Sequence, residues 1–373
     1  MTGKNYKTDV KFKSSLVIGK FYPFHLGHQH LITTAAEHST HVTVVVMGSV
    51  FQKYTVDQRV KWIEETFETY SNVTVLGIKD DVYDDYNDST IWLHHVEIIR
   101  ACLQAHNVPT VDAVFTSENY GTELAEHFQS EHFLVDLPRI TFPISGTKMR
   151  EDLYGRWEFL PTAVKQDLST RIVVIGAEST GTTTLSKDLA ESYSKDIALP
   201  SSFRNTDWIP EYGRDYTYLK LDEAKRINPN ATMDDLVWTS EDFVKIGEKQ
   251  TEWENNQVTK NNSSPLIICD TDALATTVWE QRYIGGGASG NRSYSDNLPV
   301  RDIYLITNHE GVEFEQDGIR DGEHIREAMT GEFIQLLTKR NLSWALITGD
   351  RSHRLKVATK IIDNILANKN TKF

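Results

Sequence analysis

Apolar residues along the first half of the chain follow two alternating patterns. Short runs of β-branched and other apolar residues predict strands at 16–18, 42–47, 73–78 and 111–115. Between these runs, apolar residues recur at helical spacing and predict helices at 27–37, 58–70 and 91–106. Such alternation is typical of a parallel sheet with helices on both faces. Ligands of these sheets bind at the carboxyl ends of the strands, where Gly19 and Ser117 lie.

The same alternation begins again after a short predicted helix at 147–154 and a connector at 157–168. The second half predicts strands at 171–175, 266–270, 303–306 and 344–348, and a helix at 183–193. Because a domain commonly has ~100–200 residues, a chain of 373 residues suggests two domains. We expect a flexible tail over 1–13, a first α/β domain over 14–162 and a second over 168–373.

Charge and cysteine content narrow the classes of function. The chain has 39 Lys and Arg against 53 Asp and Glu, a formal net charge of -14, which argues against nucleic-acid and membrane-surface binding. Cys102 and Cys269 have no metal-type spacing and suit a reducing compartment. No apolar run predicts a signal peptide or a membrane span. The expected location is therefore the cytoplasm.

One candidate phosphate site follows the first predicted strand. His25 and His28 flank Gly27 at the start of a predicted helix, and Lys20 comes just before them. A helix start offers free N–H groups and a partial positive charge, and the imidazoles and the ammonium add further donors. The alternative interpretation is that the two histidines are surface or capping residues.

A second phosphate motif lies at residues 144–150. Ser145 or Thr147 can cap the short predicted helix, whose amide groups can hold the β- and γ-phosphates. Lys148 and Arg150 place positive charge in the first turns, which opposes the helix dipole unless an anion binds there. A plain helix cap without a ligand is the alternative.

Longer strings around these motifs resemble one known family. These strings are Gly-Lys-Phe-Tyr-Pro-Phe-His-Leu-Gly-His at 19–28, Asp-Gln-Arg-Val-Lys-Trp at 57–62, Thr-Ser-Glu-Asn-Tyr-Gly at 116–121 and Ile-Ser-Gly-Thr at 144–147. Within the HxGH nucleotidyltransferases, they resemble the bifunctional nicotinamide mononucleotide (NMN) adenylyltransferase/ribosylnicotinamide kinase family. The resemblance implies a Rossmann-like HxGH domain followed by a P-loop kinase domain. Some members carry a helix-turn-helix repressor domain, but only about 15 residues precede the first predicted strand, so we expect no DNA binding.

For the first domain, the resemblance implies adenylyl transfer from ATP to NMN, which gives NAD and pyrophosphate, with Mg²⁺ bridging the phosphates. His25, His28, Lys20 and Arg150 are the expected catalytic residues. ATP-binding residues are expected at Gly19, Phe21, Gly27, Ser145, Thr147 and Lys148, and NMN-binding residues at Arg59, Trp92 and Ser117. Trp92 is the candidate for stacking on the cationic nicotinamide ring, and a core tryptophan is its alternative.

The second domain opens with a phosphate loop that lacks its usual lysine. The expected ATP-binding residues are Gly176, Glu178, Ser179, Thr180, Gly181, Thr182, Thr183 and Thr184, with Thr182 in the lysine position. Thr183 is the expected Mg²⁺ ligand. Three interpretations remain open: Arg320 or Arg326 replaces the lysine, the kinase is weak, or the domain is a non-catalytic sensor.

An acidic pair ends the next apolar strand. Asp270 and Asp272 are candidates for the catalytic base, and Asp270 also for a metal ligand, with a strand-terminal turn as the alternative. By resemblance, Glu211 and Arg214 lie near the nucleoside, and the reaction is phosphorylation of nicotinamide riboside. The implied ligands are ATP, NMN, NAD and nicotinamide riboside, and a homo-oligomer is possible. Another HxGH-transferase/P-loop-kinase pair, as in coenzyme A synthesis or sulfate activation, is the rival.

Overall fold

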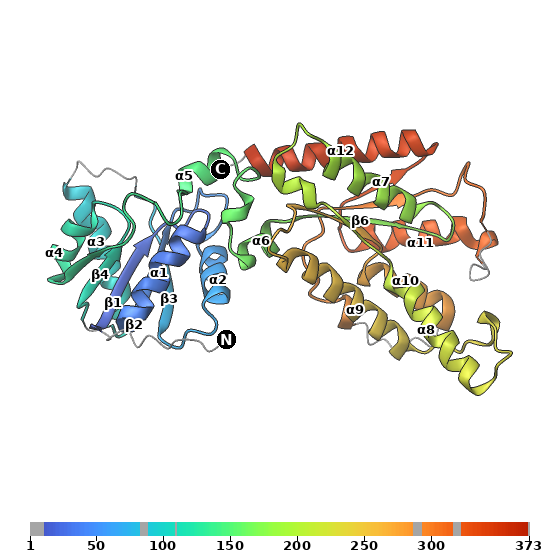
Figure 1. Ribbon diagram of the computed structural model, residues 1–373, viewed down its shortest axis with the longest axis horizontal. Coiled ribbons are helices and arrows are strands. Elements are labelled where there is room, and N and C mark those ends of the chain that lie inside the picture. The colour runs from blue at the N-terminus through green and yellow to red at the C-terminus, as the bar shows by residue number, and fades with distance from the viewer. Residues whose placement is uncertain (1–10, 83–88, 109, 286–292, 316–321, 372–373) are drawn as a thin grey trace. The chain divides into compact units, whose positions relative to one another are not determined.

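A computed structural model describes residues 11–82, 89–108, 110–285, 293–315 and 322–371. Chain contacts divide it into two compact units, the first up to Val164 and the second from Lys165 to Thr371 (Figure 1). Most of the tail predicted over 1–13 lies outside the described residues, and its last two residues belong to the first strand. No described helix combines the length and apolar character that a membrane span requires.

A five-stranded parallel sheet forms the centre of the first unit. Its strands are β1 (Phe12–Gly19), β2 (Ser39–Gly48), β3 (Val73–Lys79), β4 (Ala113–Thr116) and β5 (Glu131–Leu134). The order is β3-β2-β1-β4-β5, so the chain runs outward from β1 in one direction and then resumes on its other side at β4. That reversal opens a crevice at the carboxyl ends of β1 and β4, where ligands of such sheets bind.

Helices cover both faces of this sheet (Figure 1). They are α1 (Leu26–His38), α2 (Val56–Thr66), α3 (Ser89–Ala105) and α4 (Gly121–Phe128), followed by the short helices α5 (Gly146–Glu151), η1 (Trp157–Phe159) and α6 (Thr162–Leu168). Leu16 and Ile18 of β1 pack with Trp92, Val96 and other apolar residues of α3. The core therefore fixes α3 beside the ends of the central strands.

The second unit repeats this architecture with a different order. Its parallel strands are β6 (Thr170–Gly176), β7 (Trp208–Ile209), β8 (Leu266–Asp270), β9 (Ile303–Thr307) and β10 (Trp344–Ile347), in the order β10-β9-β6-β8-β7. Its main helices are α7 (Thr182–Lys195), α8 (Tyr212–Ile227), α9 (Ser240–Thr259), α10 (Ala273–Ile284), α11 (Arg326–Lys339) and α12 (Arg351–Thr371). Short 3-10 turns occur at Ser201–Asn205, Met233–Asp235, Ser293–Ser295 and Glu323–Ile325.

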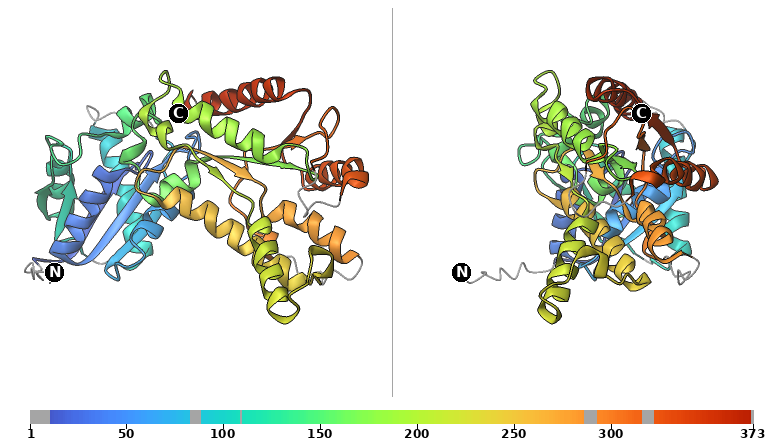
Figure 2. Two further views of the ribbon diagram at one scale, coloured as in Figure 1. Left: turned by 45° about the vertical axis from the view of Figure 1, so that its right-hand side comes forward. Right: turned by 90° about the vertical axis from the view of Figure 1, so that its right-hand side faces the viewer.

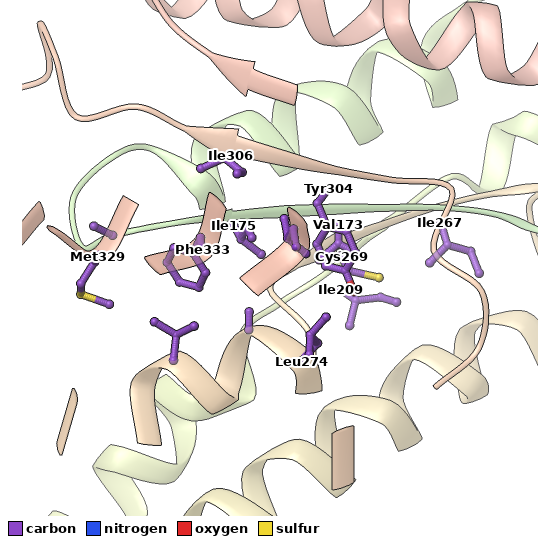
Figure 3. Packing of buried hydrophobic residues seen from close by; sticks show 14 of the residues in the cluster. Val173, Ile175, Ile209, Ile267, Cys269, Leu274, Tyr304, Ile306, Met329 and Phe333 are labelled. Carbon is purple, nitrogen blue, oxygen red and sulfur yellow. The ribbon is translucent and has the colours of Figure 1, made fainter. Parts of the chain in front are cut away.

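Helices α7 and α12 cover one face of the second sheet, and α9, α10 and α11 cover the other (Figure 2). On the latter face, Val173 and Ile175 of β6 pack with Phe333 and Met329 of α11 (Figure 3). Cys269 of β8 is fully buried in this cluster. The α/β class predicted for both halves is therefore confirmed. The sequence did not reveal β5 and β7, because edge strands of four and two residues carry little apolar pattern.

Candidate active sites

The first candidate site is built around two stacked imidazoles. His25 is the N-cap of α1, and its Nδ1 accepts a hydrogen bond from the backbone N–H of His28 over 3.3 Å. The two rings stack with centroids 3.6 Å apart. A Cβ on Gly27 would lie 3.1 Å from the His25 ring, so glycine at this position lets the imidazole lie against the backbone.

Both imidazoles are neutral around pH 7. Burial, assisted by the charge of Arg139, lowers the pKa of His25 to about 3, and burial also holds the pKa of His28 well below its usual value. Because Nδ1 of His25 accepts a bond, the proton of the neutral ring is on Nε2. This buried Nε2, like Nδ1 of His28, has no hydrogen-bond partner among the described residues. A phosphate oxygen is a suitable acceptor for the His25 N–H group.

The lowered pKa of His25 predicts a pH dependence of stability. The unfolded chain, with a histidine pKa near 6.5, binds this proton more readily than the folded chain, so stability is full above pH 6.5 and falls towards pH 3. Between pH 7 and pH 5, the loss is on the order of 2 kcal/mol. Urea unfolding of His25→Gln is expected to lack this part of the pH dependence. An unchanged pH dependence in this variant would contradict the assignment.

The imidazoles form part of the wall of a cavity of about 1000 Å³ at the carboxyl ends of the strands. The cavity brings together most residues that the sequence predicts for this site: Gly19, Lys20, Phe21, His25, Gly27, His28, Trp92, Ser117, Ser145, Thr147 and Arg150. Lys148 is exposed outside this wall, and its ammonium group donates to the carbonyl of Pro143. The cavity is therefore large enough for nucleotide ligands, which pockets of ~300–1,000 Å³ commonly hold.

A guanidinium joins the two phosphate motifs. Arg150 of α5 donates one hydrogen bond to the carbonyl of Tyr22 over 2.8 Å and a longer one to the Thr147 hydroxyl. Ser145 caps α5 by accepting a hydrogen bond from the backbone N–H of Lys148. The second motif therefore lies beside the first, as expected from two motifs that serve one ligand.

Arg59 is placed differently from its sequence-based prediction. Its side chain is fully buried and does not line the cavity. The guanidinium donates to the carbonyls of Thr55, Lys20 and Met47 and to the side chain of Gln52. Burial lowers its pKa to about 10, which leaves it charged at pH 7. In this arrangement, Arg59 positions the loop after β1 and is not available for direct contact with NMN.

The Arg59→Met substitution is therefore expected to destabilise the folded protein. It leaves several buried carbonyl groups without their donor, which should lower the free energy of unfolding by about 3 kcal/mol. Urea unfolding measures this loss, and Lys61→Met, at an exposed position of the same helix, is the matched control. A variant with wild-type stability and a raised KM for NMN would support the ligand contact instead.

Sequence reasoning missed several residues of the cavity wall. Asp80 follows β3, and His95 lies one turn after Trp92 on α3; their side chains form a buried pair. Arg139 and Glu118 form a second pair in the wall. A signal for the first was present, because Asp80 stands at a strand end and His95 shares the helix face of Trp92. Trp92 itself belongs both to the core cluster and to the cavity wall.

The second candidate site is the loop between β6 and α7. Gly181 and Ser179 have φ values of 89° and 57°, and the Thr180 hydroxyl donates to the carbonyl of Ala177. A Cβ on Gly176 would lie 2.3 Å from the Thr307 hydroxyl, so this glycine permits close packing of β6 and β9. Thr184 is exposed on the outer side of α7. The backbone thus forms a compact turn at a helix N-terminus, which suits a phosphate.

Only one member of the predicted acidic pair lies at this loop. The Thr183 hydroxyl donates to Asp270 over 2.5 Å, and Thr182 also bonds this carboxylate. Burial raises the pKa of Asp270, while these hydroxyls and the charges of Arg214 and Lys187 oppose the rise. These contacts place Asp270 beside both threonines of the loop.

Asp272 does not share this position. It is fully buried and accepts hydrogen bonds from the backbone N–H of Ala275, the Tyr304 hydroxyl and the Arg301 guanidinium. Its carboxylate therefore caps α10 and balances Arg301, which corrects its prediction as a catalytic base.

Three arginines near the loop have hydrogen-bond or ion-pair partners within the protein. Glu178 pairs with Arg282 of α10 over 3.0 Å and also accepts from the backbone N–H of Gly322. Arg354, which the sequence did not suggest, donates to the carbonyl of Thr180 in the loop. Arg326 donates to the carbonyl of Val312.

The other residues predicted for this site are one candidate lysine substitute and two nucleoside-binding residues. Arg320 lies outside the described residues. Glu211 is the N-cap of α8. Arg214, one turn further on, is one of two positive charges that act on Asp270. The predicted nucleoside residues therefore lie at the start of α8, with Arg214 close enough to influence the loop carboxylate.

Comparison with known proteins covers both units. The family model described as citrate lyase ligase C-terminal domain matches residues 13–86, and the AAA domain model matches residues 171–354. The trifunctional NAD biosynthesis/regulator protein NadR of Escherichia coli is 25% identical over 349 residues, which cover 89% of this chain and 78% of that protein. A nicotinamide-nucleotide adenylyltransferase of Thermoplasma volcanium is 26% identical over 160 residues, 40% of this chain and 81% of its own.

The solved structures agree on the fold. A crystal structure of NadR in complex with NR aligns with a TM-score of 0.62 at 21% identity, over 95% of this chain and 96% of that one. The family resemblance found in the motifs is therefore supported along both units and in the same order. This chain is a homologue of NadR along both units.

Proposed function

We propose that the first unit transfers the adenylyl group of ATP to NMN, which yields NAD and pyrophosphate. The observation that carries this proposal is the pair of neutral, stacked imidazoles at the N-terminus of α1, in the wall of a cavity of about 1000 Å³. Each ring has a buried nitrogen without a hydrogen-bond partner in the part of the chain that the structure describes. The names of the NadR and adenylyltransferase relatives point to the same chemistry.

The proposed reaction is a displacement at the α-phosphorus of ATP. A phosphate oxygen of NMN forms the new P–O bond, the bond to the β-phosphate breaks, and pyrophosphate leaves with the electron pair. The nucleophile is already ionised, so the protein has to align the two phosphates and stabilise charge. Nε2–H of His25 is a preorganised donor for this purpose. Lys20 and Arg150 line the same cavity and supply positive charge.

For the second unit, we propose phosphorylation of nicotinamide riboside by ATP. The turn at 176–183 would hold the phosphates, and Asp270 is the carboxylate that we place at the reacting hydroxyl. Thr183 and Asp270 offer hydroxyl and carboxylate oxygens, the donors that Mg²⁺ prefers, and they fit a metal ion that would neutralise phosphate charge. The alternative is a non-catalytic sensor domain. Thr182 favours this alternative, because it stands in the position of the usual P-loop lysine and its hydroxyl bonds Asp270.

A split assay tests both proposals. The protein is incubated with Mg²⁺ and ATP plus either NMN or nicotinamide riboside, and NMN and NAD are separated by chromatography. NAD from NMN is expected in the first reaction, and NMN followed by NAD in the second. No NAD from NMN would contradict the adenylyltransferase. NAD from NMN, together with no phosphorylated riboside, would contradict the kinase and support the sensor.

A further inference from the structure

A carboxylate and an imidazole form a fixed pair in the wall of the first cavity. Asp80, directly after β3, accepts a hydrogen bond from Nδ1 of His95 on α3, and the two side chains are 4% and 10% exposed. The second carboxylate oxygen of Asp80 accepts a hydrogen bond from the backbone N–H of Val82 over 3.1 Å. The backbone N–H of Asp80 donates to the carbonyl of Gly48. Both carboxylate oxygens are therefore held in place.

The other nitrogen of His95, Nε2, has no partner within the described ranges of the chain. Nε2 is buried and forms no hydrogen bond with any described residue, although buried polar atoms are nearly always paired. In the tautomer whose Nδ1–H donates to Asp80, Nε2 carries a lone pair and is an acceptor. His25 has the opposite tautomer, with its proton on Nε2. The cavity thus has a donor imidazole at the phosphate motif and an acceptor imidazole on α3.

The surroundings of His95 suit a flat ring that carries an uncharged N–H donor. Trp92 lies one turn before it on the same helix and lines the same cavity, with Tyr120 at a ring distance of 5.8 Å. Asp80 adds negative charge behind the imidazole, which repels an anionic group. A carboxamide can donate its NH₂ protons to Nε2, whereas a carboxylate at the same ring position can only accept and is repelled.

We propose that His95, held by Asp80, accepts a hydrogen bond from the carboxamide of NMN and so selects this nucleotide over its carboxylate analogue, nicotinic acid mononucleotide. The inference rests on the proposed adenylyl transfer and adds a specificity-determining residue to it. The amino group of adenine is another N–H donor, so the KM for ATP separates the two sources.

The Asp80→Asn variant tests the direction of this hydrogen bond. The amide oxygen of Asn would keep the bond from Val82, so its NH₂ group would face His95 and donate to Nδ1. The proton of His95 would then move to Nε2, which becomes a donor that favours a carboxylate. A second variant, His95→Leu, removes the acceptor. His94→Ala, at the exposed neighbouring position, is the matched control.

The measurement is kcat/KM for NMN and for nicotinic acid mononucleotide at saturating ATP, with thermal melting to verify folding. The ratio is expected to fall by about 10-fold in His95→Leu, and by more in Asp80→Asn, whose activity with the carboxylate analogue should rise. The KM for ATP and the His94→Ala ratio should stay unchanged.

One result would overturn the role of His95, and a different one would contradict the proposed function. Folded variants that make NAD from NMN with the wild-type ratio, or that change mainly in the KM for ATP, would overturn the role of His95. A wild-type protein that makes no NAD from NMN would instead contradict the proposed function.

Discussion

Replacing His28 with alanine is expected to lower the rate of NAD formation from NMN by about 10²–10³-fold, the range found when a preorganised donor is removed from a transition state. The His28 ring stacks on His25, and its buried Nδ1 in the cavity wall has no hydrogen-bond partner among the residues that the structure describes. Its removal also takes away the surface that holds the His25 ring. The loss should therefore exceed that of a single hydrogen bond in water.

Initial rates at saturating ATP and NMN measure this effect, and His41→Ala, on β2 outside the cavity, is the matched control. Phosphorylation of nicotinamide riboside should be unchanged in the His28 variant, because the second unit has its own phosphate loop. A loss below about 10-fold would contradict the assigned role. A parallel loss of both activities would contradict two separate sites.

Restoring the lysine of the second phosphate loop is expected to raise kinase activity. A charge-assisted contact with phosphate is worth about 1.5–3 kcal/mol, so Thr182→Lys should increase the rate of riboside phosphorylation roughly 10–100-fold. Among the described cations, Arg282 is paired with Glu178, and Arg354 is bonded to backbone carbonyls. The new ammonium group would also lie near Asp270, which Thr182 now bonds.

Thr184→Lys, two residues further on at an exposed position of α7, controls for the added charge. Riboside phosphorylation is followed at saturating Mg²⁺ and ATP. If Thr182→Lys binds ATP but shows no gain in rate, the missing lysine does not limit the kinase. The charge would then be supplied by another group, as the sequence-based alternative with Arg320 or Arg326 proposed.

Features that depend on neighbouring residues were predictable from the sequence. The apolar run of β1, the His25–Gly27–His28 spacing and the glycine turn before α7 each specify a strand, a helix start or a loop within a few residues. The fold class followed from their alternation, because strands joined through helices form parallel sheets. The meeting of the two phosphate motifs was expected from the family resemblance, which assigns residues of both motifs to ATP binding.

Features that depend on burial and on distant partners were not predictable. Arg59 and Asp272 are polar residues in plausible motif positions, yet each is fully buried and bonded to groups that only the folded chain brings near. Asp80 and His95 lie 15 positions apart, on a strand end and a helix. A sequence pattern shows where a polar residue lies along an element, but not which partner saturates it.

The most direct test of the account follows the phosphorus atoms of ATP. The intact protein is incubated with Mg²⁺, NMN and ATP labelled with ³²P at the α-phosphate or, separately, at the γ-phosphate. We predict that the α-label appears in NAD and the γ-label in pyrophosphate, in equal amounts and with the same dependence on NMN. An α-label that stays in ATP, ADP or AMP while NMN is present would contradict adenylyl transfer by the first unit.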